Sequence, residues 1–212
     1  MNVPAGRPMT PDSGLHGNVV PADAADLDTL SQVIADAFHD LPPSRWLITD
    51  PDARRQIFPG YFGLLIEHAM ASGLVCTTPG RDSAALWIPA GADGPQPPGD
   101  YAGRLAAVTR PWTSRFLAFD AALEKNHPAG IPHHYLAILA VRPDRQRQGT
   151  GTALLRAHHA TLDRDGIPAY LEASDPGTRT LYLACGYADH GPPVQLPGGP
   201  LMYPMARKPG SG

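Results

Sequence analysis

Hydrophobic and polar residues recur along the first third of the chain with the spacing of amphipathic helices. Asp23 is a suitable N-cap for the first helix. The apolar face of that helix comprises Leu27, Leu30, Ile34 and Phe38. A second helix should begin at Asp50-Pro51, a capping residue followed by the proline that the first helical position favours. The apolar face of this helix comprises Ile57, Tyr61, Leu64, Leu65 and Ala69. Pro59-Gly60 lies inside the second pattern and predicts a kink or a division there.

Short apolar runs bounded by turn residues predict strands in the remaining chain. These runs are Asn18 to Pro21, Leu74 to Thr78, Ala84 to Ile88, Tyr135 to Val141, Ala169 to Ala173, a segment from Tyr187 onward, and Leu201 to Arg207. Further helices are expected over 100–125, with an interruption near Pro111, over 149–166, and over 179–184. Helices come first, and strands then flank a strand–helix–strand–helix unit. This order predicts a single α/β domain with a mixed sheet.

The stretch from Tyr135 to Leu155 has the most informative pattern. Its apolar run is long enough for a strand buried on both faces, and Pro143 ends the strand because proline has no N–H to donate. Gly149-Thr150-Gly151 then opens a helix. A strand, a glycine turn and a helix start direct unpaired backbone N–H groups at a ligand, with the positive end of the helix dipole behind them. Such a site attracts phosphate, and Arg145 and Arg147 add positive charge.

Composition narrows the classes of protein. The 212 residues carry 17 basic and 20 acidic side chains and a net charge of −3, which argues against nucleic acid or a membrane surface as a partner. Cys76 and Cys185 are far apart and have no metal-type spacing, so reduced thiols in a cytoplasmic protein are expected. No apolar run is long enough to span a bilayer, and the N-terminus lacks the apolar core of a signal peptide. Residues 1–17 are predicted to be a disordered extension and 209–212 a flexible tail.

The phosphate-type turn matches one known motif. The chain has neither the GxxxxGKS/T pattern nor the third glycine of GxGxxG. Gln146-x-x-Gly149-x-Gly151 does match the R/Q-x-x-G-x-G/A motif of the GNAT acetyltransferases, and it follows a V-x-P segment and precedes an Ala-Leu-Leu helix. Tyr170 to Ser174, followed by Leu181-Tyr182-x-x-x-Gly186-Tyr187, resembles the second GNAT signature. The chain therefore resembles this family.

Within that family the chain is most similar to puromycin N-acetyltransferase, over roughly residues 18 to 209. The shared segments are Ala37-Phe38-x-Asp40-x-Pro42, Asp50-Pro51-Asp52, Ala85-x-Trp87, the Tyr135–Leu155 stretch and Pro168 to Ser174. One departure is Thr178, where many relatives carry an asparagine that could bond to pantetheine. The resemblance implies a GNAT domain over 18–208, with a mixed, mostly antiparallel, twisted sheet of about six to seven strands flanked by helices.

The resemblance also implies a donor and an acceptor. The donor is acetyl-CoA, used as a co-substrate without a metal, and the acetyl group passes directly to an amine within a ternary complex. The acceptor is a small molecule with a primary amine, such as an aminoacyl-nucleoside-type antibiotic, and acetylation of such an antibiotic would confer resistance. Residues expected to bind acetyl-CoA are Leu139, Ala140, Val141, Gln146, Arg147, Gln148, Gly149, Thr150, Gly151 and Thr152. The backbone N–H near Val141 is the expected donor to the thioester oxygen.

Three residues are candidates for proton transfer. Tyr182 is the candidate acid for the leaving thiolate, although a tyrosine here could equally be a buried aromatic. Glu172 is the candidate base, acting directly or through water, because an isolated carboxylate is unusual in an apolar strand and indicates a functional role. The alternative is that Glu172 simply lies on a solvated face of the strand. His134 is a second candidate base. Adjacent histidines diverge on a strand or a helix, so neither His133-His134 nor His158-His159 is expected to chelate a metal.

Three residues are candidates for the acceptor pocket. Trp87 and Phe38 could stack on an apolar acceptor, and Asp40 could attract a cationic amine. Core packing for Phe38 and a plain helix-end role for Asp40 are the alternatives. The acceptor could also be a polyamine, an amino acid or a protein amine, and a non-catalytic acyl-CoA sensor would preserve the same motifs. Whether the protein is a monomer or a homodimer stays open.

Overall fold

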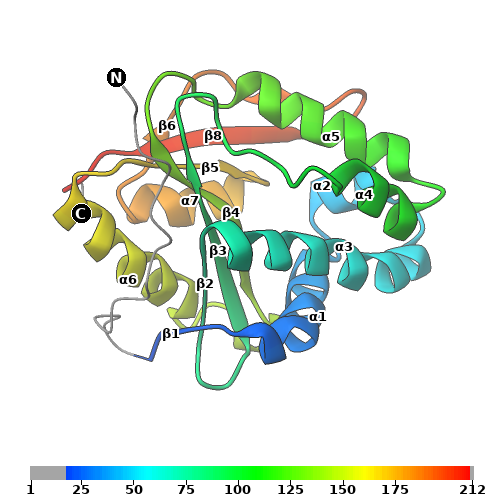
Figure 1. Cartoon of the computed structure of the whole chain (residues 1–212), viewed down its shortest axis with the longest axis horizontal. Coiled ribbons are helices and arrows are strands. Elements are labelled where there is room, and N and C mark those ends of the chain that lie inside the picture. Colours follow the sequence, from blue (N-terminus) through cyan, green and yellow to red (C-terminus); the bar gives the residue numbers. More distant parts are fainter. Residues whose placement is uncertain (1–17, 211–212) are drawn as a thin grey trace.

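A computed structural model describes residues 18–210 as an α/β structure (Figure 1). In chain order its elements are β1 (Val20–Pro21), the 3-10 turn η1 (Ala24–Asp26), α1 (Leu27–Phe38), α2 (Pro42–Leu47), α3 (Pro51–Ser72), β2 (Leu74–Thr77), β3 (Ser83–Ala90), α4 (Tyr101–Thr109), α5 (Thr113–Asn126), β4 (His133–Val141), the 3-10 turn η2 (Pro143–Arg145), α6 (Thr150–Asp165), β5 (Ala169–Ala173), α7 (Pro176–Ala184), β6 (Ala188–Asp189), β7 (Val194–Gln195) and β8 (Leu201–Arg207).

The strands form one mixed sheet in the order β1-β2-β3-β4-β5-β8-β6, with β7 paired to β8. Strands β4 and β5 run parallel, and the other pairs of named strands are antiparallel. The prediction of a mixed, mostly antiparallel sheet within an α/β fold is therefore confirmed. The described sheet has eight strands instead of the predicted six to seven, because the chain after Tyr187 supplies two short strands, β6 and β7.

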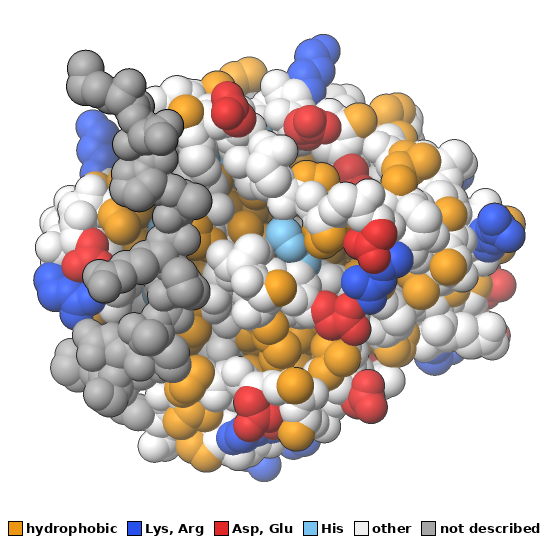
Figure 2. Space-filling view, viewed as in Figure 1, with side chains coloured by type: hydrophobic (Ala, Val, Ile, Leu, Met, Phe, Trp, Pro, Cys, Tyr) orange, Lys and Arg blue, Asp and Glu red, His pale blue; other side chains and the backbone are white. Residues whose placement is uncertain are grey.

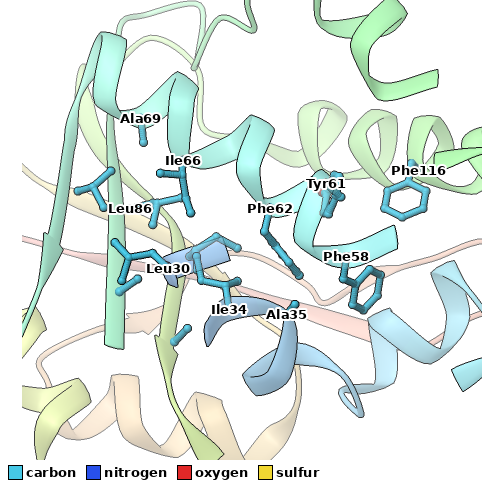
Figure 3. Close-up of a cluster of buried hydrophobic side chains, with 14 of the residues drawn as sticks. Leu30, Ile34, Ala35, Phe58, Tyr61, Phe62, Ile66, Ala69, Leu86 and Phe116 are labelled. Atoms are coloured by element: carbon cyan, nitrogen blue, oxygen red, sulfur yellow. The ribbon is translucent and has the colours of Figure 1, made fainter. Parts of the chain in front are cut away.

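Two hydrophobic clusters cover the two faces of the sheet. On one face, α1 and α3 pack against β3 and β4, and Figure 3 shows Leu30 and Ile34 of α1 beside Phe62 and Ile66 of α3. The ring of Tyr61 reaches outward from α3 to Phe116 of α5, with centroids 4.7 Å apart, and so joins α5 to this cluster. On the other face, α6 and α7 pack against β3, β4 and β5.

Strand β4 carries a bulge at Ala137. Ile138 of β4 lies opposite Leu86 of β3, and Leu136 lies opposite the next β3 residue, Trp87, so Ala137 is the additional residue. Ala137 and Ile138 consequently face the same cluster, while Leu136 and Leu139 face the other. Buried and half-buried residues alternate along β4 from His134 to Val141. The prediction that this strand is buried on both faces is therefore confirmed only in part.

Most predicted boundaries agree with the structure, although α7 begins at Pro176, three residues before the predicted start at Arg179. Asp23 caps η1 with a reciprocal capping box, and Asp50 caps α3. Helix α3 continues through Pro59 as one helix of 22 residues, so it is not divided. Helix α2 was not expected. Prolines that end one helix can also begin the next, since the first helical turn needs no proline N–H, and Pro42 is the first residue of α2.

The ends of the chain are only partly described. The predicted N-terminal extension, 1–17, lies outside the described residues, as do 211–212. Gly210 of the predicted tail donates its N–H to Asp163 Oδ1 at 2.7 Å, so the start of that tail is attached to α6. Cys76 and Cys185 are both buried free thiols. Within residues 18–210, every helix is too short or too polar to cross a membrane.

Candidate active site

The parallel strands β4 and β5 separate soon after they begin. The two strands pair only where His134 lies opposite Ala169 and Tyr135 lies opposite Tyr170. At the far end of β4, the N–H of Arg142 donates to Asp82 O at 2.8 Å. In an antiparallel ladder the direction of the backbone groups alternates, so the N–H and C=O groups of Leu139 and Val141 point away from β3 and into this opening. An extended ligand could pair there as an added strand.

The opening forms part of a cavity of about 1060 Å³. One wall comprises Leu136 to Val141 of β4 and the turn before α6, and the opposite wall includes Glu172, Ser174, Asp175 and α7. A further wing extends between α1, α3 and α5. In Figure 2, hydrophobic side chains gather toward the middle of the molecular face that Figure 1 presents. The cavity is large enough to hold two ligands side by side.

The N-terminus of α6 presents free donors to this cavity. Its N-cap, Gly149, is left-handed with φ 85°, and no side chain caps the helix. By contrast, Asp50 and Asp175 cap α3 and α7 with their carboxylates. The N–H groups of Thr150, Gly151 and Thr152 therefore have no partner within the helix. A Cβ added at Gly149 would meet nothing within 4 Å, so the space in front of these donors is open.

The predicted acetyl-CoA residues lie together at this end of the cavity. All of them line it except Gln148, whose exposed side chain donates instead to Asp144 O at 3.4 Å. Gln146 donates to Val141 O at 3.0 Å and so ties the turn to the end of β4. The free helix terminus, the open space before Gly149 and the unpaired edge of β4 fit the pyrophosphate and the pantetheine arm of acetyl-CoA.

Charge is divided between the two ends of the cavity. The arginines among its lining residues, Arg145 and Arg147, belong to the turn before α6. The wing opposite is lined by Asp93, Asp120 and Glu124. Tyr101 donates to Asp120 Oδ2 at 2.9 Å, and burial raises the pKa of Asp120 to about 6. The aromatic residues of this wing are Phe38, Phe58, Tyr61, Phe62, Tyr101 and Phe119. An anion fits the first end, and a cation with an apolar body fits the second.

Glu172 is enclosed between these two ends. It lies on β5 at the start of the opening, and its side chain is only 2% exposed. Its Oε2 accepts a hydrogen bond from the Tyr135 hydroxyl at 2.9 Å, while Oε1 is buried without a hydrogen-bond partner. Burial raises the pKa of Glu172 to about 7, opposed by the Tyr135 hydrogen bond. The carboxyl group can therefore gain or lose a proton near neutral pH.

One histidine, His127, adjoins this carboxyl group, and a second, His133, contacts the first. His127 Nδ1 is 3.9 Å from Glu172 Oε1, and His127 Nε2 is 2.9 Å from Nε2 of His133. His133 Nδ1 is 2.8 Å from the carbonyl oxygen of Ile131. Burial lowers the pKa of both imidazoles, that of His127 to about 4, so both rings are neutral at pH 7. Neither histidine was predicted to contribute to the site, because only the fold brings the loop before β4 next to β5.

Tyr182 lines the cavity from α7, opposite the turn before α6. Its ring is buried against Tyr187, with centroids 5.7 Å apart, and burial raises the pKa of its hydroxyl. Among the described residues, none makes a hydrogen bond to this hydroxyl. Thr178, which stands where relatives carry asparagine, also lines the cavity, and it donates to the carbonyl oxygen of Asp175 at 3.0 Å. Its hydroxyl is therefore used within the helix cap.

The structure separates the three predicted acceptor residues. Phe38 lines the cavity and packs edge-on against Phe62, with centroids 5.3 Å apart. Trp87 does not line it, since its side chain is fully buried on the α6 face against His158, with centroids 4.5 Å apart. Asp40 is 68% exposed outside the cavity, where its carboxylate is near Arg45 and Arg54. The predictions for Trp87 and Asp40 are therefore wrong. Sequence alone could not show the face to which each side chain points.

His134, the second candidate base, lies on the wrong face of the sheet. It is buried next to α6, with its Nδ1 2.9 Å from His158 Nε2, and burial lowers its pKa to about 4. It does not line the cavity, so the interpretation of His134 as a base is wrong. Within residues 18–210, no group of three or more His, Cys, Asp or Glu side chains is arranged to hold a metal ion.

Comparison with known proteins agrees with this geometry. Residues 115–189 match the family model described as "Acetyltransferase (GNAT) domain". Among solved structures, "histone acetyltransferase HPA2 and related acetyltransferase" from Corynebacterium glutamicum superposes with a TM-score of 0.67 and 24% identity, covering 92% of this chain and 97% of that chain. The PaiA N-acetyltransferase from Thermoplasma acidophilum, solved in complex with coenzyme A, has a TM-score of 0.53 and 11% identity, with 90% and 97% covered. Arylalkylamine N-acetyltransferase 2 from Aedes aegypti has a TM-score of 0.54 and 10% identity, with the same coverage.

The chain has the GNAT fold, and its residues 115–189, which include β4, the turn before α6, and β5, match the GNAT acetyltransferase domain model. The matched domain and the fold support an acetyl-CoA-dependent N-acetyltransferase.

Proposed function

We propose that the protein transfers an acetyl group from acetyl-CoA directly to the primary amine of a small molecule with an apolar or aromatic body. The observation that carries this proposal is the division of one cavity into a phosphate-binding end at α6 and an acidic, aromatic wing, with Glu172 between them. Both substrates can lie in this cavity together, which direct transfer requires.

Each proposed role follows from the position of a residue. Arg145, Arg147 and the first N–H groups of α6 hold the phosphates, while Leu139 and Val141 pair with the pantetheine arm. The N–H of Val141 points into the opening and stabilises the negative charge that develops on the thioester oxygen. Glu172 removes the proton that the amine must lose, and Tyr182 donates one to the departing sulfur. Since the Glu172 side chain is nearly enclosed, the Tyr135 hydroxyl or a water molecule conducts the proton to it.

The aminoacyl-nucleoside-type antibiotic suggested by the sequence is one candidate acceptor, because its primary amine and flat rings suit the aromatic wing. Incubation of the protein with acetyl-CoA and puromycin, followed by mass spectrometry, tests this candidate. An acetylated product supports it. If puromycin stays unmodified while other small amines are acetylated, the acceptor is another amine, such as a polyamine or an amino acid. If coenzyme A binds but no amine in a broad panel is acetylated, the protein is an acyl-CoA sensor.

Replacing Tyr182→Phe should lower kcat by roughly 100-fold, because the thiolate loses its proton donor. The affinity for coenzyme A should stay unchanged, since the phosphate-binding turn lies across the cavity. Turnover kinetics and calorimetric titration of coenzyme A provide the two measurements. A wild-type kcat in this variant would exclude Tyr182 as the acid and leave it as a packing residue against Tyr187.

Replacing Asp120→Asn should raise KM for a cationic amine by roughly 10-fold, through loss of one charge-assisted hydrogen bond. KM for acetyl-CoA should not change, because Asp120 lines the opposite wing. Glu124→Gln is the matched control, since Glu124 lies one turn further along α5 and is exposed. Equal effects of both substitutions would show that general electrostatic attraction, and not a contact with Asp120, attracts the amine.

A further inference from the structure

The hydrogen bonds of His133 and His127 determine which nitrogen of each ring carries the proton. The carbonyl oxygen of Ile131 can only accept, so His133 Nδ1, at 2.8 Å, must donate to it. A neutral imidazole has one N–H, which leaves Nε2 of His133 as a bare acceptor. His127 Nε2, at 2.9 Å from that nitrogen, must therefore carry the proton of its own ring. The remaining nitrogen, His127 Nδ1, is left with an exposed lone pair.

That lone pair faces Glu172. His127 Nδ1 and Glu172 Oε1 are 3.9 Å apart, and Oε1 is buried without a hydrogen-bond partner. If Glu172 is ionised, Oε1 and His127 Nδ1 face each other as two acceptors. If Oε1 carries a proton, a small rotation lets it donate to His127 Nδ1, while Oε2 continues to accept from Tyr135. The hydroxyl groups of Tyr135 and Tyr170 lie beside either form of the carboxyl group, but only the protonated form offers His127 Nδ1 a donor.

The groups that favour the charged form of the carboxyl are neutral hydrogen-bond donors, and desolvation by burial outweighs them. The titratable groups that face the carboxyl are Tyr135 from β4, Tyr170 from β5 and His127 from the loop before β4. Behind them, His133 at the start of β4 contacts His127, and His190 contacts Tyr170. Neither lysine nor arginine is among the groups that shift its pKa. The desolvated carboxylate has no cation to compensate it.

We infer that His133 holds His127 in the tautomer that presents a bare Nδ1 to Glu172, so that the free protein keeps Glu172 as a neutral carboxylic acid. His127 and His133 are thus positioning residues that set the proton affinity of the proposed base. This inference rests on the proposed function only for its role in turnover, because the protonation state belongs to the free protein.

The inference gives the reaction a required first step. Glu172 releases its own proton to solvent, which a cationic amine in the cavity favours. The ammonium loses one proton to solvent through water, which frees the lone pair that attacks the thioester. The carboxylate takes the second proton from the nitrogen as the N–C bond forms and the C–S bond breaks. The thiolate takes its proton from Tyr182, which regains one from solvent, so protons balance over the cycle. The rate should therefore rise with pH. The low-pH side of the pH–rate profile, its acid limb, should have its midpoint at the pH where Glu172 ionises.

His133→Phe is the sharpest test, because His133 has no contact with Glu172. Without the Nε2 acceptor, His127 can move its proton to Nδ1 and donate it to the carboxylate. The acid limb of kcat/KM should then move to lower pH by about one unit. A loss of packing alone would lower kcat or stability and leave the limb at the same pH. An unmoved limb overturns the inference.

His127→Asn and His127→Leu form a matched pair of equal shape. The asparagine amide can rotate and donate N–H to Oε1, so its acid limb should also move to lower pH. Leucine offers no donor, and its limb should stay at the wild-type pH or higher. Identical limbs in the two variants contradict the inference, because they would show that only the volume of residue 127 matters.

Infrared spectroscopy of the free protein provides a readout that needs no turnover. The carboxylic-acid band of Glu172, identified by its absence in Glu172→Gln, should disappear as pH rises through neutrality, and at lower pH in His133→Phe. If this band titrates as described but no amine is acetylated, the tautomer arrangement stands and the proposed function fails. If amines are acetylated but the band is absent at pH 5 to 6, the inference fails alone.

Discussion

Glu172→Gln should reduce kcat by about 10² to 10⁴, the range typical for loss of a general base. The affinity for coenzyme A should not change, since Glu172 is separate from the turn at Gly149. Glutamine reproduces the neutral acid, because its amide can donate to His127 Nδ1 while its oxygen accepts from Tyr135. The variant should therefore fold normally, and its residual activity should lose the acid limb that Glu172 causes.

Stability provides a second measure of the same residue. The pKa of Glu172 is raised from 4.5 to about 7, so the folded state binds a proton more tightly than the unfolded state. The resulting stabilisation is complete below pH 4.5 and is lost as pH rises to about 7. Thermal unfolding of the wild type relative to Glu172→Gln across this window should show that loss. A difference in Tm that stays constant with pH, together with an unchanged kcat, would remove Glu172 from the mechanism.

Gly149→Val should weaken coenzyme A binding by on the order of 100-fold or more, equivalent to about 3 kcal/mol. Gly149 has φ 85°, a conformation that a β-branched residue adopts only with strain. Its side chain would also enter the open space in front of the α6 N-terminus, where the phosphates are proposed to lie. Several charge-assisted hydrogen bonds would be lost together. Titration calorimetry with coenzyme A measures the effect directly.

Gly166→Val is the matched control for this substitution. Gly166 ends the same helix, α6, with φ 69°, and a Cβ added there also meets nothing within 4 Å. Both variants therefore strain the backbone at one end of α6, but only Gly149→Val places atoms in the cavity. Similar losses of stability with a selective loss of coenzyme A binding support the assignment. Normal binding by Gly149→Val would contradict the phosphate-binding turn itself.

The elements and the donor end of the site could be predicted because they depend on local sequence. Asp23 and Asp50 cap helices wherever the following residues have helical spacing, and Gly149 adopts a left-handed conformation because it lacks Cβ. The phosphate-type turn, the end of β4 and the start of α6 are contiguous in the chain. Their relative positions are consequently set by a few backbone dihedral angles, and the sequence motif includes all three segments.

The acceptor end could not be predicted because it depends on which faces of distant elements meet. The bulge at Ala137 changes the face to which β4 residues point, and a period-two pattern does not reveal it. His134 of β4 therefore lies on the face that α6 covers. Trp87 of β3 packs on that face too, while His127, from a loop, adjoins Glu172 of β5. Sequence by itself determined the α/β fold and indicated where acetyl-CoA would bind. Only the tertiary structure decided which carboxyl groups, aromatic rings and histidines share the cavity, since burial and proton affinity depend on neighbours that are remote in the chain.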